Sequence, residues 1–320
     1  MDETLPSIKM KSSRNKTIDF PIEQAKEYLT KCVTAQNYNG ESDSIVTGDA
    51  FKSLSKIKDG TVDLLIVDPP YNMAKNFHGN GFKAQSDIEY ESYTKAWLLA
   101  CIPKLKPTAS VYVCCDWKSA LVIGKVLSET LILRNRITWQ REKGRGAKSN
   151  WKNGMEDVFF ATVSNEYHFN LDAVKVRRKV LAPYKQNGKP KDWQETENGK
   201  FRDTCPSNFW DDISIPFWSM PENTDHPTQK PEKLYAKLIL ASSKKGDVVF
   251  DPFLGSGTTS VVAKKLGRNF CGIEQNEEYC LWTEKRLQMA ESDSSIQGYS
   301  DGVFWERNTL NLQQKVAKKF

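Results

Sequence analysis

Two apolar runs in this chain stop abruptly at short turns rich in proline or glycine. Val62–Val67 is followed directly by Asp68-Pro-Pro-Tyr71, and Val248–Phe250 is followed by the sequence DPFLGSGTTS. Proline cannot continue a strand ladder, and glycine permits backbone conformations that side chains forbid. We therefore expect two strands whose carboxyl ends are shaped by these turns.

Further apolar runs alternate with segments of helical periodicity. Strands are expected at 44–47, 62–67, 110–115, 137–139, 157–163, 247–251 and 269–274, and helices at 22–33, 90–99, 258–266 and 276–289. Such alternation is typical of a doubly wound, mostly parallel sheet, which binds ligands at the carboxyl ends of its strands. The sequence thus predicts an α/β fold.

Basic residues are concentrated in the middle third of the chain, although the net charge of the whole chain is only +6. Residues 134–152 contain seven basic residues and one acidic residue, and residues 175–191 contain seven basic residues and no acidic one. Such blocks indicate a polyanionic partner, although a solvated surface explains them equally well. Bases stack on aromatic rings, so the aromatic residues interleaved with these charges favour a nucleic acid. They are Trp139, Trp151, Tyr184 and Trp193.

The seven cysteines are scattered, and none forms a CxxC pair. With three histidines in the chain, we expect no metal site and no disulfide. No apolar run approaches the length that spans a bilayer, and the first 16 residues lack the apolar core of a signal peptide. We expect an intracellular protein.

The second turn, which contains Gly255 and Gly257, has the features of a nucleoside site. Glycines let a ligand approach the backbone, and Glu274 follows Asp251 by 23 residues, the spacing of a ribose-hydroxyl acceptor on the next strand. A dinucleotide fingerprint would require glycine where this chain has Ser260, and a phosphate-binding loop would require Gly-Lys-Ser/Thr, which does not occur. A nucleoside cofactor without phosphates, such as S-adenosylmethionine, remains. A tight turn with nothing bound is the alternative.

Taken together, the two turns resemble those of the DNA amino-methyltransferases, which methylate exocyclic amines of bases. The resemblance continues through HPTQKP (226–231), DPFLGSGTT and GIEQNEEYCLWTEKRL (272–287), and covers about residues 45–290. These long matches are specific, whereas Asp-Pro-Pro-Tyr alone is not. The Asp-Pro-Pro-Tyr motif precedes a basic segment and then the glycine turn. This is the β arrangement of the family, a circular permutation of the commoner order.

The resemblance implies a catalytic role for Asp68, Pro69, Pro70 and Tyr71. The Asp68 carboxylate would accept one hydrogen of the target amine and the Pro69 carbonyl the other, with the two prolines holding that carbonyl in one direction. Tyr71 would stack on the base, a contact worth roughly 1–3 kcal/mol. This offsets part of the few kcal/mol needed to flip the base out of the duplex.

The resemblance also implies that S-adenosylmethionine is the cofactor. Asp49 would accept a hydrogen bond from its adenine amine, and His226, Thr228 and Lys230 would lie along its methionine end. Local turns at Asp49 and at His226 that only support the pocket are the alternatives. The expected cofactor-binding residues are Asp49, Ala50, His226, Thr228, Lys230, Asp251, Pro252, Phe253, Gly255, Ser256, Gly257, Thr258 and Glu274. The expected nucleic-acid-binding residues are Arg141, Lys143, Arg145, Lys148, Lys152, Arg177, Arg178 and Lys179.

The expected activity is methylation of the N6 amine of adenine in double-stranded DNA at a specific sequence. Aspartate at position 68 favours adenine, since serine is commoner there in the cytosine N4 enzymes. Cytosine N4, an RNA amine and a protein amide are the alternatives, together with an inactive DNA-binding relic. The basic, aromatic segment favours a nucleic acid over a protein amide, and the intact motifs argue against a relic.

The expected regions are an N-terminal helical extension (1–44), a catalytic half of the core (45–165), an inserted target-recognition segment (166–224), a cofactor-binding half (225–292) and a C-terminal tail (293–320). The resemblance further suggests a homodimer and a companion restriction endonuclease. We expect either a type II restriction–modification enzyme or an orphan, phage-like one. Its location would be the cytoplasm of a bacterial or phage-infected cell, without membrane association.

Overall fold

The computed structural model describes residues 12–19, 22–77, 80–141, 149–180, 184–196, 199–307 and 309. Its helices are α1 (Ile22–Leu29), α2 (Ala50–Leu54), α3 (Asp87–Cys101), α4 (Ser119–Thr130), α5 (Glu232–Ser242), α6 (Thr258–Lys265) and α7 (Glu277–Ser292). Its strands are β1 (Val33–Thr34), β2 (Ser44–Thr47), β3 (Val62–Val67), β4 (Lys75–Phe77), β5 (Asn80–Phe82), β6 (Leu105–Cys115), β7 (Ile132–Gln140), β8 (Met155–Thr162), β9 (Val176–Lys179), β10 (Lys185–Gln186), β11 (Lys189–Pro190), β12 (Gln194–Thr196), β13 (Gly199–Thr204), β14 (Phe209–Trp210), β15 (Val248–Asp251), β16 (Asn269–Glu274), β17 (Tyr299–Ser300) and β18 (Val303–Trp305). Within these ranges, no helix combines the length and the apolar character needed to cross a membrane.

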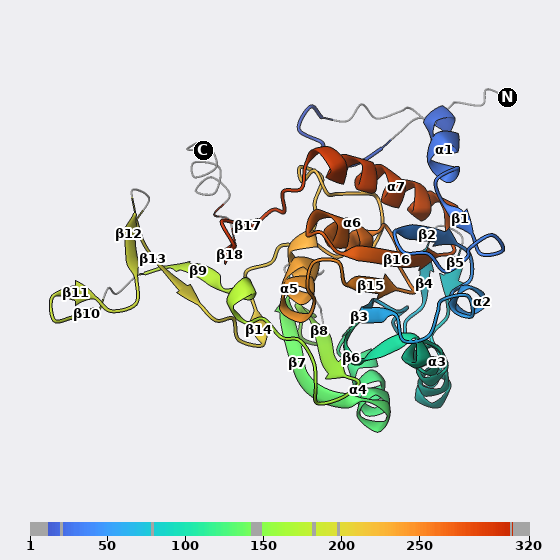
Figure 1. The fold of residues 1–320 in the computed structure, drawn as a ribbon, viewed down its shortest axis with the longest axis horizontal. Helices are drawn as coiled ribbons and strands as arrows, with labels where there is room; N and C mark the ends of the chain where they lie inside the picture. Colours follow the sequence, from blue (N-terminus) through green and yellow to red (C-terminus); the bar gives the residue numbers. More distant parts are fainter. Residues whose placement is uncertain are drawn as a thin grey trace.

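The largest element of the described chain is a nine-stranded sheet in the order β1-β2-β16-β15-β3-β6-β8-β7-β14 (Figure 1). β8 runs antiparallel to its neighbours β6 and β7, and every other neighbouring pair is parallel. The expected large, mostly parallel sheet is thus confirmed. The strand that follows β3 in the sheet, β6, lies on one side of the β3–β15 pair. The strand that follows β15, β16, lies on the opposite side. The sheet therefore has a switch point between β3 and β15, where open α/β sheets bind ligands.

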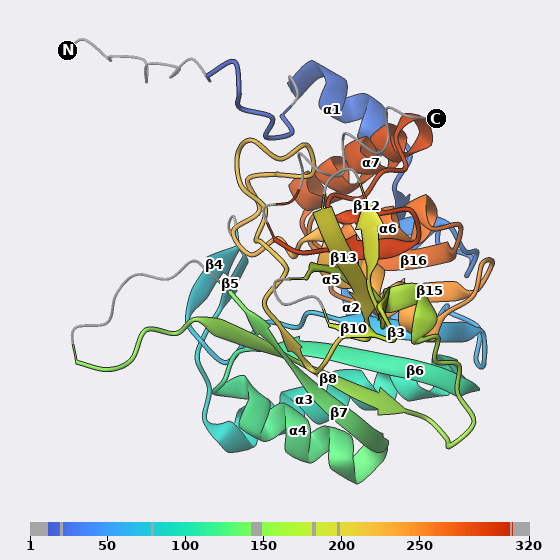
Figure 2. The same ribbon diagram turned by 90° about the vertical axis from the view of Figure 1, so that its left-hand side faces the viewer.

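Helices cover both faces of this sheet (Figure 2). On β3, Leu64 and Ile66 pack into the core formed with α5, α6 and α7, whereas Leu65 and Val67 pack into the core formed with α2, α3 and α4. Successive residues of a strand point to opposite faces. An almost continuous apolar run therefore suits a central strand that is covered on both sides.

Most of the expected elements are present, with shifted ends. The expected strands lie in β2, β3, β6, β7, β8, β15 and β16, and the expected helices lie in α1, α3, α6 and α7. The first helix ends at Leu29 and does not reach Val33, which begins β1. The sequence did not predict α2, α4 and α5. Nearly every residue of α5 is buried, including the charged Lys233 and Lys237, so its charged residues do not mark a side of the helix that faces solvent.

A second sheet, with the order β12-β13-β9-β18-β17, projects from one side of the molecule (Figure 1). β9, β12 and β13 come from the segment 166–224, and β17 and β18 come from the region after residue 292. β18 pairs in parallel with β9, so that Phe304 lies beside Val176. Part of the region expected to be a tail therefore completes a sheet whose other strands lie about 100 residues earlier in the chain.

A buried charge cluster joins this second sheet to the main body. Asp212, which follows β14, accepts hydrogen bonds from Nζ of Lys237 at 2.7 and 2.9 Å and lies 2.8 Å from Nζ of Lys233; both lysines are on α5. Lys233 also donates to the carbonyl of Trp305 on β18. Burial lowers the pKa of Lys237 to about 8. Although burial alone would raise the pKa of Asp212, the two lysines hold it at about 2.

We expect Asp212→Ala to lower the free energy of unfolding by about 3–5 kcal/mol, because it leaves two buried ammonium groups without their carboxylate. Asp211→Ala is the matched control, since that carboxylate is about half exposed and lies 3.6 Å from Arg178. It should change the stability by less than about 1 kcal/mol. Urea denaturation followed by circular dichroism measures both. Equal losses in the two variants would contradict a special role for the cluster.

Candidate active site

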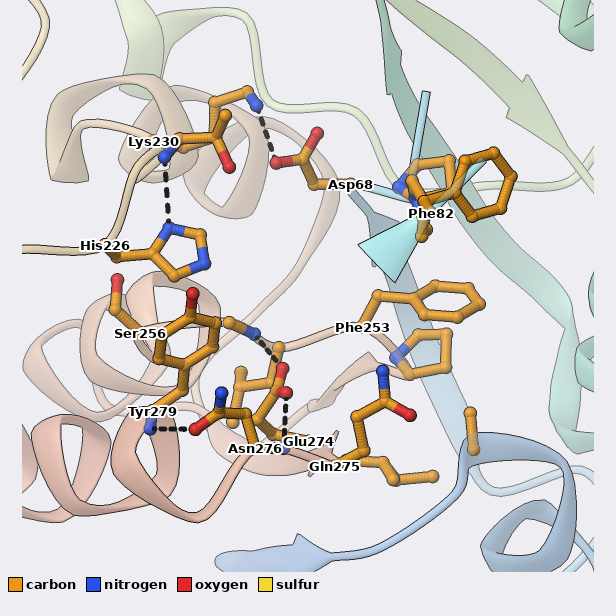
Figure 3. Close-up of a pocket in the computed structure, with 18 of the residues that line it drawn as sticks. Asp68, Phe82, His226, Lys230, Phe253, Ser256, Glu274, Gln275, Asn276 and Tyr279 are labelled. Carbon is orange, nitrogen blue, oxygen red and sulfur yellow. Dashed lines mark hydrogen bonds and ion pairs between the residues drawn. The ribbon is translucent and has the colours of Figure 1, made fainter. Parts of the chain in front are cut away.

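A pocket of about 300 Å³ opens where β2, β3, β15 and β16 end. Its walls include Asp49 after β2, Tyr71 after β3, Phe253 after β15 and Glu274 at the end of β16. The segment 226–230, which precedes α5, supplies a further wall (Figure 3). These four strands are parallel and end at the same edge of the sheet, so turns that are far apart in the chain meet around one cavity.

The glycine turn after β15 forms the wall beside Glu274. Gly255 and Gly257 have φ angles of 58° and 83°, a left-handed conformation that glycine adopts without strain. The N–H of Gly255 donates to Oε2 of Glu274 at 2.8 Å, and the N–H of Asn276 donates to Oε1 at 2.8 Å. A Cβ on Gly257 would lie 2.4 Å from Cγ2 of Thr283. Gly257 therefore allows α6 and α7 to approach each other, whereas Gly255 faces the pocket.

Two carboxyl groups near this turn have pKa values above the ordinary range of carboxyl groups. Burial raises the pKa of Glu274 to about 7, against the hydrogen bonds that its carboxylate accepts from backbone N–H groups. Burial also raises the pKa of Asp251 to about 7, partly offset by hydrogen bonds from Thr259 and from the N–H of Phe253. Glu274 lines the pocket, whereas Asp251 lies behind its wall and holds the start of the turn.

The segment His226–Pro231 runs past the glycine turn and connects it to the far end of the pocket. The His226 ring packs edge-on against Tyr279 of α7, with ring centroids 4.4 Å apart. The carbonyl of Lys230 accepts a hydrogen bond from the Thr258 hydroxyl at 3.0 Å. The segment therefore supports the glycine turn and also lines the pocket. A supporting role and a position beside the cofactor, the two interpretations of the sequence, are thus compatible.

Asp68 lies at the opposite end of the pocket from Glu274 (Figure 3). Its Oδ1 accepts a hydrogen bond from the Tyr71 hydroxyl at 2.8 Å, and its Oδ2 accepts one from Nζ of Lys230 at 2.6 Å. The Tyr90 hydroxyl of α3 donates to the carbonyl of Pro70 at 3.0 Å. Both the carboxylate and the proline backbone are therefore held by neighbouring elements.

Glu156, at the start of β8, completes a charge cluster around Asp68. Its Oε2 lies 3.2 Å from the Tyr71 hydroxyl and 3.3 Å from Nζ of Lys230, and its Oε1 accepts from the Arg141 guanidinium. Burial alone would raise the pKa of Glu156, but Lys230 and Arg141 outweigh this effect and lower it. Burial likewise opposes the charge of Lys230, yet Asp68 and Glu156 raise its pKa. Lys230 is therefore cationic and Glu156 anionic at neutral pH.

Most of the residues expected from the sequence surround this pocket. Those that line it are Asp49, Ala50, Asp68, Pro69, Pro70, Tyr71, His226, Thr228, Lys230, Pro252, Phe253, Gly255, Ser256, Thr258 and Glu274. Asp251 and Gly257 support the wall from behind. This position agrees with the expected site, but the role of each residue stays a prediction.

The basic residues expected to bind nucleic acid are placed less uniformly. Lys143, Arg145 and Lys148 lie outside the described residues. Lys152 and Lys179 are exposed. Arg177 and Arg178 lie 2.8–3.6 Å from acidic side chains, and Arg141 is directed inward to Glu156. Contact with a nucleic acid stays a prediction for all of them.

The aromatic residues among these charges fall into two groups. Trp151 is 93% exposed, and Tyr184 is 65% exposed. Trp139 and Trp193 are buried, and the indole of Trp139 donates to the carbonyl of Ile213 at 3.0 Å. Of the four, we therefore expect only Trp151 and Tyr184 to be available for stacking on a base.

The sequence did not single out Glu156, Asn276 or Tyr279. A charged pair, Glu156-Asp157, opens an otherwise apolar strand, and this is a signal that could have been used. Asn276 caps α7, since its Oδ1 accepts from the N–H of Glu278 at 2.9 Å; asparagine before two acidic residues predicts such a cap. No local pattern marks Tyr279.

Residues 62–285 match the family model of the N6/N4 methyltransferases, which is described as DNA methylase. The chain belongs to this family of DNA amino-methyltransferases. The family predicted from the two turns is thus confirmed. The match spans the Asp68 turn, Glu156, the segment 226–231 and the glycine turn.

Several curated relatives are similar along most of their length. DNA adenine methyltransferase YhdJ from Escherichia coli K12 is 34% identical over 260 residues, which cover 79% of this chain and 85% of the relative. Type II methyltransferase M.HpaI from Haemophilus parainfluenzae is 32% identical over 258 residues, which cover 80% and 76%. Type II methyltransferase M1.MboII from Moraxella bovis is 32% identical over 245 residues, which cover 72% and 91%.

Solved structures show the same fold. The PvuII DNA methyltransferase, described as cytosine-N4-specific, has a TM-score of 0.58 at 16% identity, and the match covers 80% of this chain and 94% of that one. A complex of M1.HpyAVI with S-adenosylmethionine has a TM-score of 0.53 at 23% identity, and the match covers 76% and 98%. At these identities the comparison establishes the mixed α/β architecture with a large, mostly parallel sheet.

Proposed function

We propose that this DNA amino-methyltransferase transfers a methyl group from S-adenosylmethionine to the N6 amine of an adenine flipped out of double-stranded DNA. The observation that carries the proposal is the Asp68 carboxylate, held at one end of a pocket whose other end is the glycine turn with Glu274. Among the relatives, YhdJ is named as an adenine methyltransferase. Cytosine N4 is the alternative, since PvuII methyltransferase shares the fold.

The pocket fits S-adenosylmethionine. The carboxylate of Glu274 at the end of β16 would accept from ribose hydroxyls. Asp49, which follows β2 and caps α2 through Oδ1, would accept from the adenine amine. Phe253 and Ile273 provide apolar walls for a flat ring. A Cβ on Gly255 would lie 3.1 Å from Nε2 of His226, so a larger residue would narrow this wall. When bound, the cofactor supplies an electrophilic methyl group on a sulfonium.

The Asp68 turn is suited to the amine of the base. The carboxylate of Asp68 and the carbonyl of Pro69 would accept its two hydrogens and favour a more pyramidal, more nucleophilic nitrogen. Nζ of Lys230 lies 5.3 Å from the centroid of the Tyr71 ring. The base would therefore stack on the other face of this ring.

The proposed target-recognition unit is the second sheet, formed by β9, β12, β13, β17 and β18. The proposed halves of the circularly permuted core are residues 45–165 and 225–292. Arg177 and Arg178 lie on β9 of that sheet, with Lys179 at its exposed end. A homodimer and a companion endonuclease are part of the proposal, as the family resemblance suggests. M.HpaI and M1.MboII are named type II methyltransferases.

The direct test uses S-adenosylmethionine with a tritiated methyl group and unmethylated genomic DNA. After digestion to nucleosides, chromatography should place the label in N6-methyladenine. Label in N4-methylcytosine would establish the alternative base. Absence of label from DNA, with the cofactor bound, would contradict the proposed reaction.

Asp68→Ala should lower the single-turnover rate of methyl transfer by roughly 10²–10³-fold or more, as expected when one positioned group that acts on the reacting atoms is lost. The affinity for S-adenosylmethionine should stay within about threefold, because the carboxylate acts on the base. Rapid-quench assays and calorimetry measure the two quantities. An equal loss of cofactor affinity would place Asp68 in the cofactor site instead.

The affinity for S-adenosylmethionine should depend on pH through Glu274. Because the pKa of this carboxyl is raised to about 7, it is largely protonated at pH 6 and ionised at pH 8, and the ionised form suits a cationic cofactor with ribose hydroxyls. Affinity should therefore rise by up to about tenfold over this range, with proton release on binding that is close to one near pH 6 and falls toward zero near pH 8. Calorimetry of Glu274→Gln should show a flatter profile. The exposed Glu277→Gln is the control, and loss of the slope there would refute the assignment.

A further inference from the structure

Each oxygen of the Asp68 carboxylate accepts a hydrogen bond from a protein side chain. The Tyr71 hydroxyl donates to Oδ1 at 2.8 Å, and Nζ of Lys230 donates to Oδ2 at 2.6 Å. The Lys230 side chain is 5% exposed, and that of Asp68 is 17% exposed, so little water competes with this ion pair. In the proposed function, Asp68 must instead accept a hydrogen from a weakly acidic amine. An ionised carboxylate has about four acceptor positions, of which these contacts use two, and the close ammonium offsets the negative charge that would attract the hydrogen of the amine.

Both partners of Asp68 also reach a second carboxylate. Oε2 of Glu156 lies 3.2 Å from the Tyr71 hydroxyl and 3.3 Å from Nζ of Lys230. The Tyr71 hydroxyl and Nζ of Lys230 each lie closer to Asp68 than to Glu156. A small shift of either donor would bring it closer to Glu156. One oxygen atom of Glu156 is thus the alternative acceptor for both groups that occupy Asp68.

Glu156 is itself held in place. Its side chain is 5% exposed, and its other oxygen accepts from the guanidinium of Arg141, which follows β7. Glu156 lies opposite Trp139 in the β7–β8 ladder. The cluster therefore contains two carboxylates and two cations bonded to them, and Lys75, which lines the same pocket, lies within electrostatic range of all four.

We propose that Glu156 is a positioning residue that takes over Lys230 and the Tyr71 hydroxyl from Asp68 when the target amine binds. This inference rests on the proposed function, in which Asp68 accepts from the amine. The exchange breaks the two short contacts of Asp68 and strengthens the two longer contacts of Glu156. It frees lone pairs of Asp68 for the amine without exposing a buried charge.

The first experiment compares Glu156→Gln with Asp157→Asn. Glutamine preserves the shape of the side chain but carries no negative charge to attract Lys230. We expect the single-turnover rate to fall by about tenfold or more, while the affinities for S-adenosylmethionine and for DNA stay within about threefold. Asp157 is equally buried but is bound to Thr138, so its variant should keep the rate within about threefold. A full rate in folded Glu156→Gln would overturn the proposal.

The second experiment distinguishes positioning from a structural role. In a Lys230→Met background there is no ammonium to transfer and only the Tyr71 hydroxyl can pass to Glu156, so Glu156→Gln should lower the remaining rate by a smaller factor, about threefold. A structural role predicts the same factor in both backgrounds, and that result would overturn the proposal. Thermal unfolding checks that each variant folds.

Glu156→Asp provides a second variant should Glu156→Gln be unstable, since it keeps the charge beside Arg141 but shortens the reach to Lys230. It should show the same dependence on Lys230, and a full rate in this variant would count against the proposal. The unmodified protein separates the two levels of inference. If it transfers no methyl group to DNA, the proposed function fails. If it transfers and the Glu156 variants match its rate, only the positioning role fails.

Discussion

The pairing of β15 with β3 is the constraint on which the site depends. Val249 lies opposite Leu64, and Phe250 lies opposite Leu65, although these residues are 185 positions apart in the chain. Because the two strands are parallel, the Asp68 turn and the glycine turn emerge at the same edge of the sheet. An antiparallel pairing would place them at opposite edges. The pocket therefore follows from strand direction as much as from the residues that line it.

The two ends of this pocket differ in electrostatics. At the glycine turn, Glu274 has backbone N–H groups as partners, and burial brings its pKa close to 7. At the other end, Lys230 and Arg141 compensate the carboxylates of Asp68 and Glu156. Buried charges are tolerated when each has an opposite charge and hydrogen bonds. The charge of Glu274 can therefore change with pH near neutrality. The charges around Asp68 stay the same, and in the proposed exchange only the partners of Lys230 and Tyr71 change.

The features that the sequence reveals are those decided by local backbone chemistry. The prolines after β3 and the glycines after β15 restrict the chain whatever surrounds them, so both turns could be recognised. The sequence did not reveal α5, because its charged residues Lys233 and Lys237 are buried against Asp212 and mark no side that faces solvent. It also passed over Glu156, since an acidic residue at the start of a strand has no visible partner until β3, β7 and β8 are assembled.

The sequence by itself determined the two strand-end turns, the family and the order of its motifs, because these depend on residues that are adjacent in the chain. Only the tertiary structure decided that Lys230 bonds to Asp68 and that Arg141 is directed inward to Glu156. It also decided that β18 joins β9. The physical reason is that ion pairs and strand ladders depend on distances between segments remote in the chain, and these distances are set by the packing of the whole sheet and its helices.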